Sequence, residues 1–297
     1  MAQKVIPIPT LNDGPGDFQQ LFAIWSQAND YFENVRFDFS ACRFLRPNAV
    51  AFLGGLARLI ESRLGTAAFD WDTLRGNAVM MNLCQNGFAG NFGRPSTAWT
   101  GNSIPYREDK VLDVNGILDY LTYSWLGRGW VNLSQRLRDA IVGRMWEIYN
   151  NAFEHAGSEI GVFSCGQHFP RTNDLILSVV YFGQGIAANV RNFLSLDPRA
   201  GQLTAAGCLR WAFQRGTSTR PNGMARGLGL DLLKEFVRVN HGKLEVYSNE
   251  GYGLIEESGA RFANRTLSFE GTVFHINLRC DERLYRFADE ANTNSPF

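Results

Sequence analysis

The residues of this chain that are best suited to chemistry lie on one predicted helix. Glu147, Asn151 and His155 recur every four residues within the helical segment 133–156. Because four residues turn an α-helix by about 400°, these side chains form a slowly drifting stripe on one face. A carboxylate, an amide and an imidazole in such a stripe can hold an activated water, bind a metal ion through oxygen and contact a phosphate. The stripe is equally typical of the polar face of a surface helix, and both interpretations stay open at this point.

Two glycine turns follow this helix in the chain. The strand predicted over 175–182 runs into Gly183-Gln184-Gly185-Ile186, where glycine lets the backbone approach a flat ligand closely. Further on, Arg226-Gly227-Leu228-Gly229 opens a helix predicted over 228–240. Free N–H groups at a helix start, with an arginine nearby, form a common anion site. Either turn alone is a weak indication of a ligand.

The composition indicates a folded chain with roughly two domains of about 150 residues. Hydrophobic residues make up 45% of the 297 residues, so a sizeable core can form. The 29 basic residues are balanced by 29 acidic ones, which argues against a binder of nucleic acid or of anionic membranes. The start of the chain has no signal-peptide pattern, and no apolar run is long enough to span a bilayer. Five widely spaced cysteines without a CxxC pair are typical of free thiols, so we expect a cytoplasmic protein.

Alternating helices and strands are expected to position the motifs. The first part of the chain predicts a small sheet covered by helices, with helices over 17–32, 49–63 and 77–85 and strands over 34–40 and 69–74. The segment 87–106 is rich in Gly, Asn, Ser and Pro and is predicted to separate two domains. The second part predicts helices over 111–126 and 133–156 and strands over 159–164, 175–182, 243–248, 254–257, 260–265 and 272–278. The expected fold class is therefore α/β (α+β), with domains at 1–105 and 106–280 and a frayed polar tail at 281–297.

The order of the motifs in the second domain resembles the GHKL superfamily of ATPases, which includes gyrase, histidine kinases and mismatch-repair ATPases. The matching residues are Glu147, Asn151 and His155 (the N box), Gly183 and Gly185 (the first glycine box), Gly227 and Gly229 (the second glycine box) and Thr272 in a late strand. The resemblance covers about 111–280, and its four separated motifs keep their order and spacing. It implies a Bergerat-type α/β sandwich for the second domain.

The resemblance also implies ATP and Mg²⁺ as cofactors. Asn151 would coordinate Mg²⁺, and Glu147 would orient or deprotonate the attacking water. The remaining nucleotide contacts would come from His155, Tyr181, Gly183, Gly185, Ile186, Thr272 and the phosphate-binding residues Arg226, Gly227, Leu228 and Gly229. The segment 201–225 would form a mobile lid over ATP, and Ser218, Thr219 and Arg220 lie in it.

Tyr181 departs from the family pattern. The family has an aspartate at this position, which accepts a hydrogen bond from the adenine amino group and holds a water. A phenol is larger and neutral, and loss of a charge-assisted hydrogen bond costs about 1.5–3 kcal/mol, or one to two decades in affinity. We therefore expect changed purine selectivity or weakened nucleotide binding.

The first domain resembles the STAS-like domains of anti-anti-sigma factors through Phe37-Asp38-Phe39-Ser40, Phe44-Leu45 and the apolar helix that follows. Those domains carry a phosphorylated serine near the start of this helix. Here the matching stretch is Arg46-Pro47-Asn48-Ala49, so a phosphoswitch at this site is not expected. A structural or dimerising αβ domain is the alternative. The pairing is similar to uncharacterised bacterial proteins that join a STAS-like domain to a GHKL ATPase.

Two functions of different class follow from the resemblance. In the first, the protein hydrolyses ATP or phosphorylates a partner protein on Ser or Thr, with lid closure as the switch. In the second, it is a nucleotide-gated regulatory module without turnover, because Tyr181 replaces the adenine-binding aspartate. Autophosphorylation of the histidine-kinase type is not expected, because none of the four histidines precedes the N box. A protein partner and a homodimer are compatible with both functions.

Overall fold

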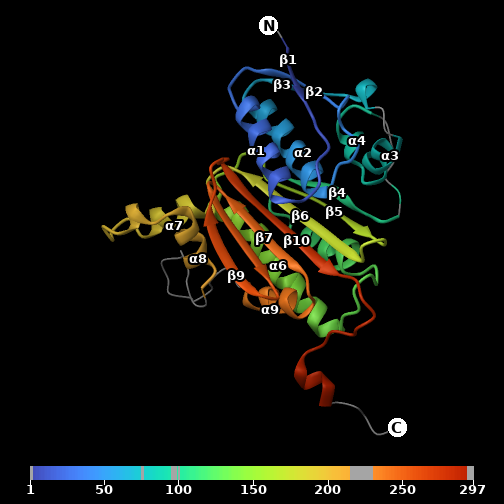
Figure 1. The fold of residues 1–297 in the computed structure, drawn as a ribbon, viewed down its shortest axis with the longest axis vertical. Helices are drawn as coiled ribbons and strands as arrows, with labels where there is room; N and C mark the ends of the chain where they lie inside the picture. Colours follow the sequence, from blue (N-terminus) through green and yellow to red (C-terminus); the bar gives the residue numbers. More distant parts are fainter. Residues whose placement is uncertain (1–2, 75–76, 95–98, 100, 215–229, 293–297) are drawn as a thin grey trace.

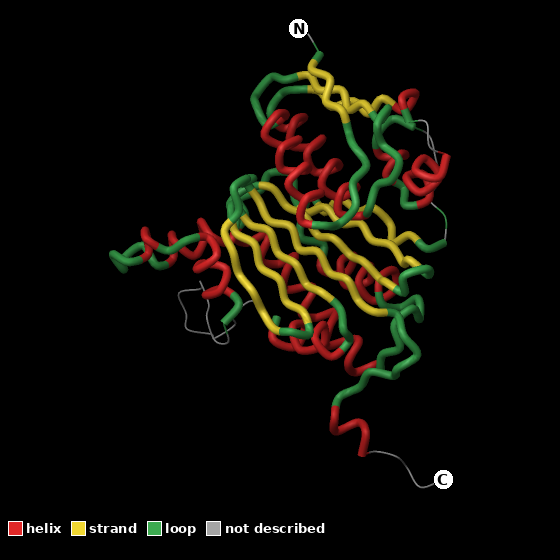
Figure 2. The backbone as a smooth tube through the Cα atoms, in the orientation of Figure 1, coloured by secondary structure: helices red, strands yellow, loops and turns green. Residues whose placement is uncertain are grey.

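The computed structural model describes residues 3–74, 77–94, 99, 101–214 and 230–292. Helices and strands alternate along this part of the chain and form two sheets with helices around them, which confirms a mixed α/β fold (Figures 1 and 2). None of the helices in the described ranges is long and apolar enough to cross a membrane.

The smaller sheet is parallel and has the order β1-β2-β3. Its strands are β1 (Lys4–Pro7), β2 (Asn34–Asp38) and β3 (Thr66–Asp70). The connecting helices are α1 (Pro15–Ala28) and α2 (Pro47–Ser62), and each has a proline in its first turn, where the missing N–H costs nothing. The turn η1 (Trp71–Thr73) and the helices α3 (Asn77–Gln85) and α4 (Phe88–Asn91) complete this N-terminal unit.

The larger sheet has seven strands in the order β4-β5-β6-β10-β7-β8-β9, and every neighbouring pair is antiparallel. The strands are β4 (Ser103–Asp109), β5 (Val162–Phe169), β6 (Asp174–Phe182), β7 (Lys243–Ser248), β8 (Gly251–Glu256), β9 (Gly259–Asn264) and β10 (Gly271–Arg279). Successive side chains of a strand point to opposite faces, so β6 contributes to two separate cores. Val179 and Tyr181 join the core on one face, and Val180 and Phe182 join the core on the other.

Helices of the second half of the chain cover the face that carries Tyr181. They are α5 (Val114–Asp119), the π-helical turn η2 (Tyr120–Trp125), α6 (Gln135–His155) and α9 (Asp231–Val239). The helices α7 (Ile186–Phe193) and α8 (Ala205–Ala212), with the turn η3 (Ala200–Gln202) between them, extend to the side of the sheet beyond β9 (Figure 1).

The N-terminal unit covers the opposite face of the larger sheet. In α2, Gly55 lies so close to the sheet that an added Cβ would sit 2.5 Å from the Phe182 ring and 2.7 Å from the Phe163 ring. The ring of Phe22 on α1 stacks on Phe269 with centroids 4.5 Å apart. The apolar residues of both sheets on this side therefore belong to one continuous core.

The strand predicted over 69–74 is β3, which ends at Asp70 and is followed by the turn η1, and the strand predicted over 159–164 is β5, which begins only at Val162. Further predicted segments also differ in the structure. The predicted boundary segment 87–106 contains α4 and the start of β4, because Ile104 and Tyr106 are buried against the larger sheet and its partners. The helix predicted over 111–126 begins only at Val114 and widens into a π-helical turn at Tyr120. Part of the tail predicted to fray from 281 onward is bonded to the rest of the chain: the turn η4 (Ala288–Asn292) lies at the start of α6, where the Ser134 hydroxyl donates a hydrogen bond to Glu290 at 2.9 Å.

Candidate functional site

The predicted polar stripe lies on α6, as expected from its spacing. The helix starts after Ser134, whose hydroxyl accepts a hydrogen bond from the Leu137 N–H. Its buried positions face the sheet and recur at helical spacing, namely Ile141, Met145, Ile148, Tyr149 and Ala152. Glu147, Asn151 and His155 flank this buried face and are all partly exposed. A ligand beside α6 can therefore reach all three side chains.

The C-terminal end of α6 is bonded to the first glycine turn. The backbone N–H of Gln184 donates to the Ala156 carbonyl at 2.6 Å, and the Asn189 side-chain amide donates to the His155 carbonyl at 3.0 Å. Gly183 has a φ of +122°, and a Cβ there would overlap with the Ala156 carbonyl oxygen. Glycine is thus required at 183 by the close approach of the helix end, and the stripe ends directly beside the turn.

Gly185 meets a pair of polar side chains that the sequence motifs do not include. Ser248 accepts a hydrogen bond from the Ile186 N–H at 2.7 Å, and its hydroxyl lies 2.9 Å from the Thr272 hydroxyl. A Cβ at Gly185 would overlap with the side-chain oxygen of Asn249. Ser248 ends the predicted strand 243–248 and Asn249 follows it, without any motif of their own, so nothing in the sequence singles them out. Ser248 fixes the start of α7 and connects the turn to Thr272, and Asn249 lies against Gly185.

Tyr181 completes a buried row of hydroxyl groups with Thr272 and Ser248. The three residues are direct neighbours across β6, β10 and β7. Tyr181 is 4% exposed and Thr272 is 0% exposed. Burial raises the pKa of Tyr181 to about 12, although a hydrogen bond with Thr272 acts in the opposite direction. Tyr181 is therefore a neutral phenol near pH 7, and its side chain is bonded to that of Thr272.

The carboxylate of Glu147 is paired within α6. Its Oε1 lies 2.7 Å from an Arg144 nitrogen, and the two side chains are 21% and 42% exposed. Exposed pairs at this spacing contribute only a few tenths of a kcal/mol, about 0.2–0.5. An incoming ligand can therefore displace Arg144 at little cost. Arg144 was not among the predicted site residues, because its type is common on helix surfaces.

The second glycine box and residues 215–225 of the predicted lid lie outside the described part of the chain. Ser218, Thr219, Arg220, Arg226, Gly227, Leu228 and Gly229 all lie outside the described residues. The described part of the lid, 201–214, contains α8, and α9 begins at Asp231 just after the second glycine box. Within the described ranges, no three His, Cys, Asp or Glu side chains gather as they would around a metal ion.

No protein-family model matches the chain, and its sequence matches no curated protein. The site is therefore defined by its own geometry.

Proposed function

We propose that this protein is a GHKL-type protein that binds Mg-ATP between α6 and the edge of the larger sheet. The supporting observation is the direct bonding of the α6 end to the glycine turn, from Gln184 to Ala156 and from Asn189 to His155. This bonding brings the end of the polar stripe and Gly183 to the ends of the central strands β6, β10 and β7, where the hydroxyl row lies. In the same proposal the N-terminal unit is a STAS-like domain.

Asn151 is the residue proposed to hold Mg²⁺. Its side chain is partly exposed, one helical turn before His155. Mg²⁺ in nucleotide sites commonly takes one or two protein ligands and completes its shell with phosphate oxygens and waters. A single amide oxygen therefore suits such a site, and no acidic cluster is needed. Bound Mg-ATP would supply a phosphoryl group in which the metal offsets the developing negative charge.

Glu147 is the residue proposed to act on the nucleophile. It precedes Asn151 by one turn on the same side of α6. Its carboxylate would accept a hydrogen bond from a water, or from a Ser or Thr hydroxyl of a protein partner, and take up the proton during transfer. To do so it must exchange part of its contact with Arg144, and the exposed pair allows this exchange.

A non-catalytic, nucleotide-gated module is the second candidate function. The burial of Tyr181 beside Thr272 favours this second candidate, because a neutral ring replaces the family's carboxylate in the proposed base-binding position. In that case nucleotide binding would order the lid and change a protein interface without turnover.

A single pair of measurements on purified full-length protein tests both candidates: calorimetric titration with Mg-ATP, and phosphate release. For the first candidate we expect Glu147→Ala to lower kcat by at least about a hundredfold, since general-base catalysis typically contributes 10²–10⁴. Its Kd for Mg-ATP should change less than about twofold. Asp139→Ala is the matched control, because Asp139 is an exposed carboxylate on the same helix that accepts hydrogen bonds from the Gln135 side chain.

The outcomes separate the candidates. Unchanged turnover in Glu147→Ala would refute its role as the base. Tight binding by the wild-type protein with no phosphate release and no labelled partner would favour the gated module. Absence of binding to ATP, GTP and ADP in the presence of Mg²⁺ would overturn the proposed function itself.

A further inference from the structure

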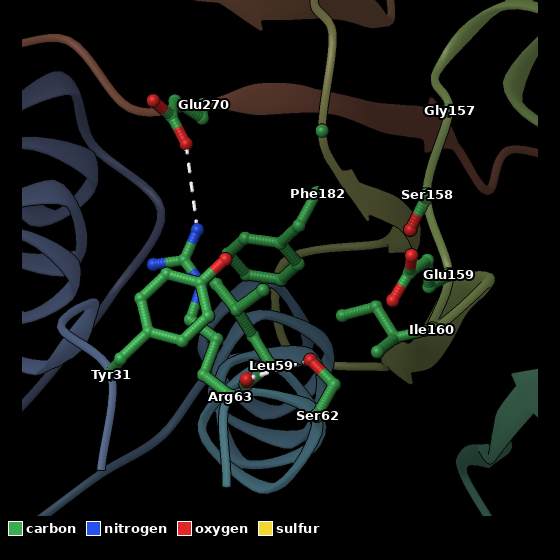
Figure 3. A pocket seen from close by; sticks show the side chains of 11 residues that line it. Tyr31, Leu59, Ser62, Arg63, Gly157, Ser158, Glu159, Ile160, Phe182 and Glu270 are labelled. Carbon is green, nitrogen blue, oxygen red and sulfur yellow. Dashed lines mark hydrogen bonds and ion pairs between the residues drawn. The ribbon is translucent and has the colours of Figure 1, made fainter. Parts of the chain in front are cut away.

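A pocket of about 230 Å³ lies behind the first glycine turn, on the side of the sheet covered by the N-terminal unit. It is lined by the end of α2, by Tyr31 from the α1–β2 loop, by the loop between α6 and β5, and by the end of β6. Figure 3 shows Tyr31 and Arg63 on one side of it, Ser158 and Glu159 on the other, and Phe182 between them.

The pocket is rich in hydrogen-bond acceptors and has a single cation. Of the residues that line it, Arg63 is the basic one, and Glu159 and Glu270 are acidic. The hydroxyls of Ser62 and Ser158 already donate to backbone carbonyls, at 2.9 and 3.4 Å, so their oxygens remain as acceptors. A matching ligand therefore carries a donor-rich cationic group next to one anionic group.

Arg63 and Glu270 are placed to receive these two groups side by side. Their closest nitrogen and oxygen atoms lie 3.6 Å apart, which is too long for a hydrogen bond. The Arg63 side chain is only 18% exposed, and it is anchored by a hydrogen bond to the Asn29 carbonyl and by the Tyr31 ring 5.4 Å away. A guanidinium held in this way can bind a carboxylate through two parallel hydrogen bonds. Leu59 and Ile160 add an apolar part to the wall, beside the polar side chains of Ser62, Ser158 and Glu159.

The backbone beside the pocket is strained in two places. Phe32 follows Tyr31 with a φ of +62°, and Leu64 follows Arg63 with a φ of +63°. Bulky side chains rarely adopt this left-handed conformation, and such strain concentrates at ligand sites and switches. The two loops are joined by a hydrogen bond from the Phe32 N–H to the Arg63 carbonyl at 3.0 Å. This hydrogen bond keeps together the two loops that carry Tyr31 and Arg63.

We propose that this pocket binds an α-amino acid with an apolar side chain. Its carboxylate would pair with Arg63, and its ammonium group with Glu270. Its side chain would lie on the apolar part of the wall at Leu59 and Ile160. In an α-amino acid the two opposite charges are carried by groups on one carbon, as the adjacent Arg63 and Glu270 require.

The bound amino acid would also act on the nucleotide site, and this part rests on the proposed function. The Glu270 carbonyl accepts a hydrogen bond from the Gly183 N–H at 3.1 Å. The loop Gly157 to Ile160 continues directly from Ala156, the carbonyl partner of Gln184. A ligand that joins Glu270 to this loop would fix both sides of the first glycine turn and so change nucleotide affinity.

Calorimetric titration of the full chain with L-leucine and L-phenylalanine, without nucleotide, tests the site. We expect saturable binding of at least one of them. The corresponding compounds without the amino group (4-methylpentanoic acid) or without the carboxylate (3-methylbutylamine) should bind at least tenfold more weakly. Glu270→Gln should weaken amino-acid binding at least tenfold. Glu257 is an exposed carboxylate just after β8 and is paired with His241, which precedes β7. Glu257→Gln should therefore leave amino-acid binding unchanged.

Absence of saturable heat with both amino acids, or equal affinity for the two truncated compounds, would overturn the site. Because Glu270 is 67% exposed and makes one ion pair, its substitution should leave the thermal unfolding midpoint within a few degrees, which separates loss of binding from loss of fold. A second titration measures the Kd for Mg-ATP with and without saturating amino acid. A change of at least threefold supports the coupling, and an unchanged Kd overturns it. Amino-acid binding without any nucleotide binding would leave the site standing and refute the proposed function instead.

Discussion

At the scale of single residues, Tyr181 decides how the proposed nucleotide site can work. Its ring is buried between α6 and the sheet, and its hydroxyl belongs to the row with Thr272 and Ser248. The ring fills space that a smaller carboxylate would leave open. The side chain at 181 therefore controls both the room available for a base and the acceptor offered to it.

We expect Tyr181→Asp to strengthen ATP binding by at least about tenfold, since a charge-assisted hydrogen bond contributes about 1.5–3 kcal/mol. Loss of the buried ring should lower the free energy of unfolding by about 3 kcal/mol or more. Calorimetry with Mg-ATP and urea unfolding measure the two effects. Tyr181→Phe is the control, because it keeps the ring and removes only the hydroxyl. Weaker ATP binding by Tyr181→Asp would mean that the phenol itself contacts the ligand.

Residue types and spacing were enough to predict that the polar stripe lies on a helix and that a glycine turn follows β6. Polar residues at every fourth position lie on one side of a helix. The left-handed conformation of Gly183 against Ala156 shows why glycine is needed there, whereas a ligand contact of Gly183 stays a prediction. Ser248, Asn249 and Arg144 could not be predicted, because each acts through a neighbour that only the folded chain provides. The pairing of Tyr181 with Thr272 likewise depends on the register of β6 with β10.

At the scale of elements, the Gly54-Gly55 pair sets how closely α2 approaches the larger sheet. We expect Gly55→Ala to destabilise the protein by about 1–3 kcal/mol, because its Cβ would overlap with the rings of Phe182 and Phe163. Gly143→Ala in α6 is the matched control, since a Cβ there meets nothing within 4 Å. The control should stabilise by about 0.5–1 kcal/mol through helix propensity alone. Urea unfolding at pH 7 measures both, and a stabilising Gly55→Ala would contradict the close packing of α2.

Elements with one strong local signal were predicted best. The helix 77–85 and the strand 243–248 occupy the predicted residues, because apolar spacing and flanking turn residues agree there. β4 was missed because Pro105 and a register shift between Ile104 and Arg107 interrupt its alternation. β1 is only four residues long and is defined by its pairing with β2. The widening of η2 into a π-helical turn has no sequence signal that we can identify.

At the scale of the whole molecule, a buried polar contact joins the N-terminal unit to the centre of the larger sheet. Asp13 precedes α1, and its Oδ2 lies 3.6 Å from His275 Nε2 on β10, while His275 Nδ1 lies 2.8 Å from the Ser178 hydroxyl. Burial acts to raise the pKa of Asp13, but the hydrogen bond and charge of His275 and the charge of Arg46 outweigh it. The pKa of Asp13 is therefore lowered.

This direction fixes the pH dependence of stability. A carboxyl whose pKa is lower in the folded than in the unfolded state stabilises the fold above about pH 4 and loses that contribution as the pH falls through its folded pKa. We expect Asp13→Asn to be less stable than the wild type at pH 6. It should lose less unfolding free energy between about pH 5 and pH 3. Urea unfolding at several pH values tests this, with the exposed Asp119→Asn as control. Parallel curves for Asp13→Asn and the wild type would contradict it.

The stacking of Phe22 on Phe269, and of Phe18 on Tyr247 with centroids 4.1 Å apart, has a practical consequence for dissecting the molecule. Cutting the chain between the two sheets would expose a large apolar surface on each fragment, and such surfaces drive aggregation. Neither half is then a suitable reagent by itself. A truncated chain would lose activity because it aggregates, and this loss would not show which half carries the activity. Point substitutions in the intact chain are therefore the appropriate tool.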